Sequence, residues 1–172
     1  MKSSHLLSGL PGYQDQGKHR QQKIVAEELK KIGLKHEHLD GETIRELLPK
    51  TGFSKHEVDE HIKRVGLLAS RLENVGVFVV ASFIFPYQES RDFVRKICKN
   101  YVEVYLSTPV EVCASREKNN LFRRARAGEI KNFPGVDVLY EAPKQPDLNI
   151  DTTHKTIHES ADQIMRYLKK YL

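Results

Sequence analysis

Strand-like apolar runs alternate with helical patterns along the whole chain, and this alternation restricts the fold more than any other feature. Val77–Phe85 is almost entirely apolar and rich in β-branched and aromatic residues, as expected of a strand that is covered on both faces. Val58–Asn74 before it and Ser90–Lys99 after it carry apolar residues at helical spacing. Strands that alternate with helices predict βαβ units, and hence a parallel sheet with helices on both faces.

The same patterns extend over the full length of 172 residues, which suits one domain with a core of its own. Strands are predicted at His5–Leu10, Lys35–Leu39, Val77–Phe85, Tyr101–Leu106 and Leu148–Asp151, and helices at Gln21–Ile32, Thr43–Leu48, Val58–Asn74, Ser90–Lys99, Pro109–Lys118 and Ile157–Leu172. Pro49 is expected to end the second helix. No repeat or linker divides the chain, so we expect a single domain over residues 1–172.

The segment Gly9–Arg20 lies between the first predicted strand and the first predicted helix, and it carries three glycines and a lysine. From Gly12 the spacing G-x-x-x-x-G-K is that of a Walker A loop, in which backbone N–H groups and a helix N-terminus bind a phosphate. The residue after the lysine is normally Ser or Thr, whose hydroxyl binds Mg²⁺, but here it is His19. The sequence therefore predicts a three-layer P-loop NTPase-like α/β domain with a mainly parallel sheet of about five strands, altered at its metal-binding position.

Composition narrows the class of partner. A formal net charge of +5 favours an anionic ligand, and the basic run Arg123–Lys131 lacks the aromatic spacing of a nucleic-acid platform. No apolar stretch is long enough to span a bilayer and no signal peptide is visible, so we expect a cytoplasmic protein that contacts no membrane. Cys98 and Cys113 are far apart and are expected to be thiols.

One segment is specific enough to indicate a family. Residues 120–143, NLFRRARAGEIKNFPGVDVLYEAP, closely resemble the lid and substrate loop of adenylylsulfate (APS) kinases. Further blocks that resemble this family follow one another in the expected order: LDGE at 39–42, GFS at 52–54, IKRVG at 62–66, SFIFPY at 82–87 and TPVEVC at 108–113. The resemblance covers nearly the whole chain and implies a lid over about residues 116–134.

The resemblance also implies a reaction, because this family transfers the γ-phosphoryl group of ATP to the 3′-hydroxyl of adenylylsulfate. The expected cofactors are ATP and Mg²⁺, and the expected partner is a nucleotide or another small anionic ligand. Family members are often dimers, so a homodimer is a further expectation. Phosphoryl transfer depends mainly on positioning and on neutralising charge.

Individual residues take roles only through this resemblance. On the nucleotide side, the implied residues are Gly12, Gly17, Lys18, His19 and Arg116. Lys18 would lie along the β- and γ-phosphates as a catalytic residue, and Arg116 would lie near the ATP base. Asp40 would be the second catalytic residue, orienting the attacking hydroxyl or holding Mg²⁺ through water.

On the substrate side, the implied residues are Arg45, Phe53, His61, Phe85, Lys131 and Phe133. Arg45 would bind the phosphosulfate group, and Phe53 and Phe133 would enclose the adenine. Lys131 would close over the anions together with the arginines of the lid.

Several departures from the family pattern fall on this same site. The family loop has one residue where this chain has Tyr13–Gln16, and a hydroxyl pair where it has His19 and Arg20. The family also has arginine, asparagine, serine and aspartate where this chain has Val58, His61, Phe85 and Glu42. Imidazole is a poor ligand for Mg²⁺. These changes predict a redesigned or degenerate site whose kinase activity is impaired or lost.

Two alternatives remain open at this point. The first is a non-catalytic domain that binds a nucleotide or anion. The second is an engineered protein with a new hydrolytic or metal site in the former substrate cleft, for which pairs such as His36 and His38 offer ligands on one face of a strand. No residue is assigned as a metal ligand.

Overall fold

The structure, a computed structural model, describes residues 4–9, 16–47, 52–117 and 119–172. Five strands form one parallel sheet in the order β2-β3-β1-β4-β5. They are β1 (Ser4–Gly9), β2 (His36–Asp40), β3 (Phe78–Phe83), β4 (Glu103–Leu106) and β5 (Leu148–Ile150). Because β1 is central, its carboxyl end at Gly9 lies in the middle of one edge of the sheet.

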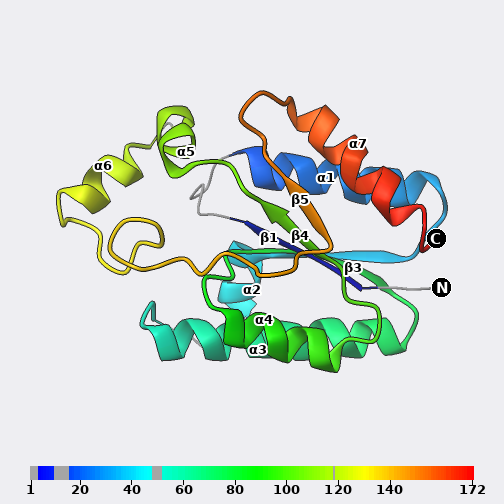
Figure 1. The fold of residues 1–172 in the computed structure, drawn as a ribbon. Helices are drawn as coiled ribbons and strands as arrows, with labels where there is room; N and C mark the ends of the chain where they lie inside the picture. Colours follow the sequence, from blue (N-terminus) through cyan, green and yellow to red (C-terminus); the bar gives the residue numbers. More distant parts are fainter. Residues whose placement is uncertain (1–3, 10–15, 48–51, 118) are drawn as a thin grey trace.

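Helices cover both faces of this sheet (Figure 1). α1 (Gln16–Lys31) and α7 (Ile157–Leu168) lie on one face, and α3 (Lys55–Asn74) and α4 (Gln88–Ile97) lie on the other. The shorter helices α2 (Gly41–Leu47), α5 (Val110–Arg116) and α6 (Leu121–Arg126) lie towards the end of the sheet where the strands finish. The predicted three-layer α/β fold is confirmed.

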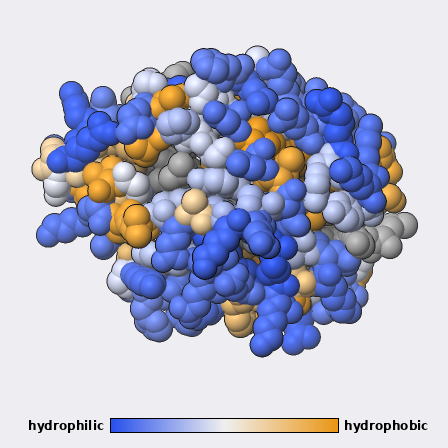
Figure 2. Space-filling model, in the orientation of Figure 1, coloured by the Kyte–Doolittle hydropathy of each residue, from blue (hydrophilic) through white to orange (hydrophobic). Residues whose placement is uncertain are grey.

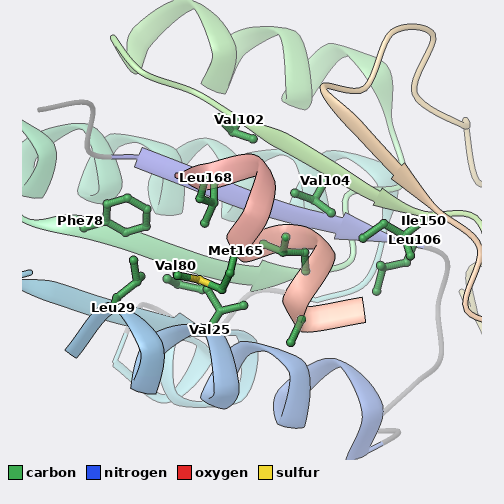
Figure 3. Packing of buried hydrophobic residues seen from close by; sticks show 12 residues of the cluster. Val25, Leu29, Phe78, Val80, Val102, Val104, Leu106, Ile150, Met165 and Leu168 are labelled. Carbon is green, nitrogen blue, oxygen red and sulfur yellow. The ribbon is translucent and has the colours of Figure 1, made fainter. Parts of the chain in front are cut away.

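Alternate residues of β3 explain why its sequence is apolar without interruption. On one face Val80 belongs to a buried cluster with Val25 and Leu29 of α1 (Figure 3). On the other face Val79 belongs to a second buried cluster, to which α3 contributes Val65. A strand with a hydrophobic core on each side has no polar face, as expected for a buried parallel strand.

Four helices begin earlier than their apolar pattern predicts, and the difference is largest for α1 and α3. α1 begins at Gln16 instead of Gln21, because its first residues are polar and give no periodic signal. α3 begins at Lys55, because Ser54 caps the helix: its side chain accepts from the N–H of Glu57, whose side chain returns to the Ser54 N–H. The expected stop at Pro49 lies outside the described residues.

Other boundaries differ more modestly, and one helix is missing from the prediction. β3 ends at Phe83 instead of Phe85. Helix α6 was not predicted, because only Phe122 and Ala125 of its short span are buried, which is too little to give a helical period. The lid therefore contains a helix where the sequence indicated only a loop.

The face of the molecule in Figure 2 is mostly hydrophilic where the structure describes it. On the part of the face in Figure 2 that the structure describes, hydrophobic residues form small separate groups among hydrophilic ones. No helix among the described residues has the length and apolar character needed to cross a membrane.

Both cysteines are free, and burial raises the pKa of the Cys98 thiol to about 12, which makes it unreactive near pH 7.

Candidate active site

The carboxyl ends of the strands meet at one edge of the sheet, beside α2, α5 and α6 (Figure 1). Ligands of parallel α/β sheets bind outside this edge. Asp40 is the last residue of β2 and pairs in register with Ser82 of β3. The predicted catalytic carboxylate therefore lies where the topology places a ligand site.

Helix α2 continues directly from Asp40 and carries a basic side chain to an exposed ring. The Asp40 carboxylate accepts hydrogen bonds from the N–H and hydroxyl of Thr43 at 3.5 and 3.4 Å, which tie the start of α2 to the end of β2. The Arg45 guanidinium carbon lies 4.7 Å from the centroid of the Phe53 ring, within the range of a cation–π contact. Because Phe53 remains 48% exposed, ring surface is left for a ligand.

Glu57 fixes the loop that presents Phe53. Its carboxylate accepts hydrogen bonds from the Gly52 N–H at 3.1 Å, the Ser54 N–H at 3.1 Å and the Ser54 hydroxyl at 2.5 Å. These bonds, the hydroxyl first, lower the pKa of Glu57. Sequence reasoning did not single out Glu57, although the S-x-x-E spacing of a capping box was a signal for it.

His61, on α3, lies in the core beneath this edge with only 1% of its surface exposed. Its ring centroid is 5.8 Å from that of Phe83, which makes an edge contact with the buried ring of Phe85 at 6.1 Å. Neither ring nitrogen of His61 has a hydrogen-bond partner among the described residues. Burial, reinforced by the charges of Arg45 and Arg64, lowers its pKa to about 4. The imidazole is therefore neutral near pH 7, with a donor and an acceptor to offer.

The lid has a small core of its own. Phe133 is buried and packs against Phe122 with ring centroids 5.0 Å apart, whereas Lys131 is exposed. No ring contact joins Phe133 to Phe53 within the described parts of the chain. The predicted adenine sandwich between these two rings stays a prediction.

Arg116, predicted near the ATP base, joins the end of α5 to the segment after β5. Its guanidinium donates to the carbonyl oxygens of Thr152 at 3.1 Å and Thr153 at 2.6 Å. The side chain is exposed. These contacts place Arg116 on a fixed support at the carboxyl side of the sheet.

The glycine-rich loop is described only in its last part. Gly17, Lys18 and His19 lie in the first turns of α1, as a phosphate-binding loop requires, but their side chains lie outside the description. Gly12 lies outside the described residues altogether. The roles predicted for these four residues remain predictions.

The described residues give no support to a metal centre. Nowhere in these residues do three or more His, Cys, Asp or Glu side chains lie together as metal ligands would. His36 Nδ1 lies 3.1 Å from the Leu34 carbonyl oxygen, and His38 Nε2 lies 2.8 Å from Gln22 Oε1. Ordinary hydrogen bonds thus account for this pair of histidines.

Comparison with known proteins identifies the family. The family model described as adenylylsulphate kinase matches residues 5–151. The chain belongs to the adenylylsulfate kinase family. The adenylyl-sulfate kinase of Picosynechococcus sp. is 43% identical over 145 residues, which are 84% of this chain and 82% of that protein. The adenylyl-sulfate kinase of Halothermothrix orenii is 38% identical over 165 residues, 95% of this chain and 88% of that one.

Solved structures of adenylylsulfate kinases have the same fold. The Mycobacterium tuberculosis APS kinase, in complex with AMPPNP and APS, has a TM-score of 0.89 and 31% sequence identity, with 97% of each chain covered. A shikimate kinase from Acinetobacter baumannii, at 17% identity and a TM-score of 0.64, shares the fold alone. The P-loop kinase fold predicted from the sequence is confirmed.

Proposed function

We propose that this chain binds adenylylsulfate and an ATP-type nucleotide at the carboxyl edge of its sheet, and that it catalyses the family's phosphoryl transfer far more slowly than relatives with an intact phosphate loop. The proposal combines two features. The substrate side keeps groups that suit an adenine and an anion. The phosphate side has lost groups that the transfer itself needs.

The exposed stack of Arg45 on Phe53 is the observation that carries the binding half of the proposal. An aromatic ring that is 48% exposed and held by a capped helix offers a stacking surface to an adenine. The adjacent guanidinium supplies positive charge and hydrogen-bond donors for a phosphosulfate. A relative of this family was solved with both AMPPNP and APS bound, which supports the choice of ligands.

The transfer half of the proposal rests on the residues that replace the family's phosphate loop. Asp40 fits a Mg²⁺ site, because it is a carboxylate at the strand end. Lys18, however, is followed by His19 and Arg20 instead of a hydroxyl pair, and Tyr13–Gln16 lengthens the loop before it. Mg²⁺ bound beside the phosphates would neutralise their charge, so losing an oxygen ligand slows the transfer.

A coupled assay of ATP-dependent phosphorylation of adenylylsulfate tests this proposal, with the Picosynechococcus enzyme measured in parallel. We expect a rate at least about 100-fold below that of the relative, the size of effect that follows from losing one stabilising interaction with the transferred group. Calorimetry with adenylylsulfate should still detect binding. A normal turnover rate would overturn the transfer half, and no binding at millimolar ligand would overturn the binding half.

A second candidate is a domain that binds its nucleotide without turnover. The residues after Lys18 favour it, because His19 and Arg20 offer no hydroxyl to Mg²⁺, while the Arg45–Phe53 pair serves binding whether or not transfer follows. Binding of adenylylsulfate with no product after prolonged incubation would select this candidate.

A homodimer is also proposed, and sedimentation equilibrium of the purified chain tests it.

A further inference from the structure

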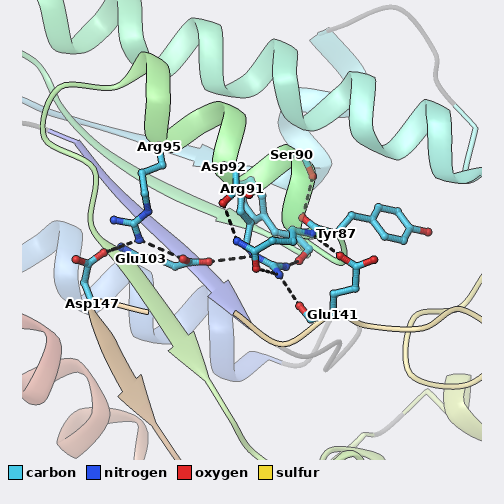
Figure 4. Close-up of polar contacts among 10 residues, drawn as sticks. Tyr87, Ser90, Arg91, Asp92, Arg95, Glu103, Glu141 and Asp147 are labelled. Carbon is cyan, nitrogen blue, oxygen red and sulfur yellow. Dashed lines mark hydrogen bonds and ion pairs between the residues drawn. The ribbon is translucent and has the colours of Figure 1, made fainter. Parts of the chain in front are cut away.

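The segment 139–147 joins the lid to β5, and we refer to it as the strap. It is fastened to the rest of the fold at both ends (Figure 4). Near the lid, the N–H of Glu141 donates to the carbonyl oxygen of Pro86 at 2.8 Å. Near β5, the Asp147 carboxylate accepts from the N–H of Glu103 at 2.8 Å and from Arg95 at 2.9 Å. The strap therefore has a fixed path from the carboxyl end of β3 to the amino end of β5.

Arg91 of α4 binds the lid end of the strap and the segments around it. Its guanidinium is only 1% exposed. Nη1 donates to the carbonyl oxygen of Phe85, and Nη2 donates to the Gln88 side chain at 2.9 Å and to the carbonyl oxygen of Glu141 at 2.5 Å. Nε lies 3.3 Å from the Glu103 carboxylate. One side chain thus joins the turn after β3, the start of α4, β4 and the strap.

The planar guanidinium of arginine suits this position, whereas the ammonium group of lysine does not. A guanidinium presents five N–H donors in fixed directions, so it can reach several acceptors that lie around one plane. The charge is balanced by Glu103, itself 3% exposed, because an unpaired charge at this depth would be expensive. Lysine would keep the charge but would present a single ammonium group to acceptors on several segments.

The strap also binds the first turn of α4. Tyr87 is the N-cap residue of that helix, and its side chain makes no capping hydrogen bond. Instead the Glu141 carboxylate accepts from the N–H of Gln88, in the first turn, at 2.7 Å. A carboxylate at this place also complements the helix dipole. The helix that holds Arg91 is thereby held in turn by the strap.

We propose that Arg91 is a positioning residue that fixes the strap, and with it the lid, against the substrate side of the site, and that Glu141 is its partner. The connection to the site runs through Phe85, whose carbonyl oxygen binds Arg91 and whose ring touches Phe83 beside His61. The inference rests on the proposed function, because adenylylsulfate is the ligand whose binding the strap would affect.

Glu141 offers the sharper test, because Arg91 is buried and its variants are at greater risk of misfolding. Glu141→Ala removes the cap of α4, whereas Glu141→Gln keeps an acceptor oxygen. We expect Glu141→Ala to speed amide hydrogen exchange in residues 134–143 and to weaken adenylylsulfate binding by about tenfold, the usual effect of one charge-assisted hydrogen bond. Glu141→Gln should restore most of both properties. Arg91→Lys, where it folds, should resemble Glu141→Ala.

Glu159→Ala is the matched control. Glu159 also caps a helix, accepting from the N–H of Thr156 at 2.7 Å at the start of α7. Its loss should lower stability without changing exchange in residues 134–143 or ligand affinity. Unchanged exchange in Glu141→Ala, or an equal change in Glu159→Ala, would overturn the inference. If the parent chain binds no adenylylsulfate, the proposed function fails, and the exchange data still decide the role of the strap.

Discussion

At the scale of single residues, the buried side chains of Arg91 and His61 differ in the charged groups that surround them. Arg91 has an acidic neighbour in Glu103, 3.3 Å away, which offsets the cost of burying its charge. For His61, burial lowers the pKa most, and the positive charges of Arg45 and Arg64 lower it further, so the imidazole is neutral near pH 7. For His61, burial and the neighbouring positive charges both favour the neutral imidazole, whereas Arg91 is buried beside a carboxylate of opposite charge.

His61 should make the stability of the protein depend on pH. Its pKa is about 4 in the folded protein, against an ordinary value of 6.5 for an exposed histidine, so the unfolded chain binds a proton that the folded chain excludes. Stability is therefore full above about pH 6.5 and falls as the pH drops towards 4, by about 2 kcal/mol between pH 7 and pH 5. Urea unfolding at both pH values checks this. The variant His61→Asn should lose this share of the dependence, whereas His158→Asn, at an exposed position, should keep it.

Phe53 should matter for binding and little for stability. Because its ring is 48% exposed, Phe53→Ala should change the free energy of unfolding by less than about 1 kcal/mol. The same change removes a stacking surface, and adenine stacking on an aromatic ring is worth about 1–3 kcal/mol, so adenylylsulfate should bind at least about fivefold more weakly. Calorimetry and thermal melts separate the two effects. An equal loss in Leu67→Ala, an apolar residue that is also 48% exposed, would show that the effect is not specific.

At the scale of helices and strands, α3 and α4 pack closely because Gly66 has no side chain. A Cβ atom at this position would lie 2.6 Å from Cγ2 of Val94, well inside van der Waals contact. The close approach also lets Cys98 Sγ reach the Gly66 carbonyl oxygen at 3.8 Å. This packing sets the position of α4, and so of Arg91.

Gly66→Ala should therefore destabilise the protein, even though alanine is the better helix former. The helix gains about 1 kcal/mol from alanine, but overpacking a close contact costs about 1–3 kcal/mol, so we expect a net loss of about 1 kcal/mol. The test is a double-mutant cycle with Val94→Ala, read by chemical unfolding. Gly66→Ala should become neutral or stabilising in the Val94→Ala background. The same loss in both backgrounds would contradict the packing argument.

Local sequence patterns predict the elements better than they predict the contacts between them. The apolar run at 77–85 predicts β3, because both of its faces are buried. Nothing local predicts the strand order, which depends on pairing between distant segments, or α6, which buries too few residues. The place of Asp40 at a strand end follows from the predicted strand at Lys35–Leu39, whereas its catalytic role is implied only by the family resemblance. The role of Arg91 was not, because its acceptors come from Phe85, Gln88 and Glu141, which meet only in the folded chain.

At the scale of the whole molecule, the scaffold and the phosphate loop depart from the family to different degrees. The family model matches residues 5–151, and a solved relative superposes over 97% of the chain. Under the proposed function, the residues that weaken phosphate and Mg²⁺ binding are those on either side of Lys18. A scaffold kept to this extent should accept the family's loop without further changes.

Repairing the loop is the most direct test of this separation. The variant replaces Tyr13–Gln16 by one alanine and converts His19 and Arg20 to serine and threonine, as in the family pattern. The repaired loop regains the Mg²⁺ hydroxyl ligand and the normal phosphate cradle. We therefore expect ATP-dependent phosphorylation of adenylylsulfate to rise by at least about 100-fold, with unchanged affinity for adenylylsulfate. Lys18→Ala in the repaired chain should abolish the gain, since the lysine would then no longer contact the phosphates. A parent chain that already turns over as fast as the repaired one would show that the altered loop is catalytically competent.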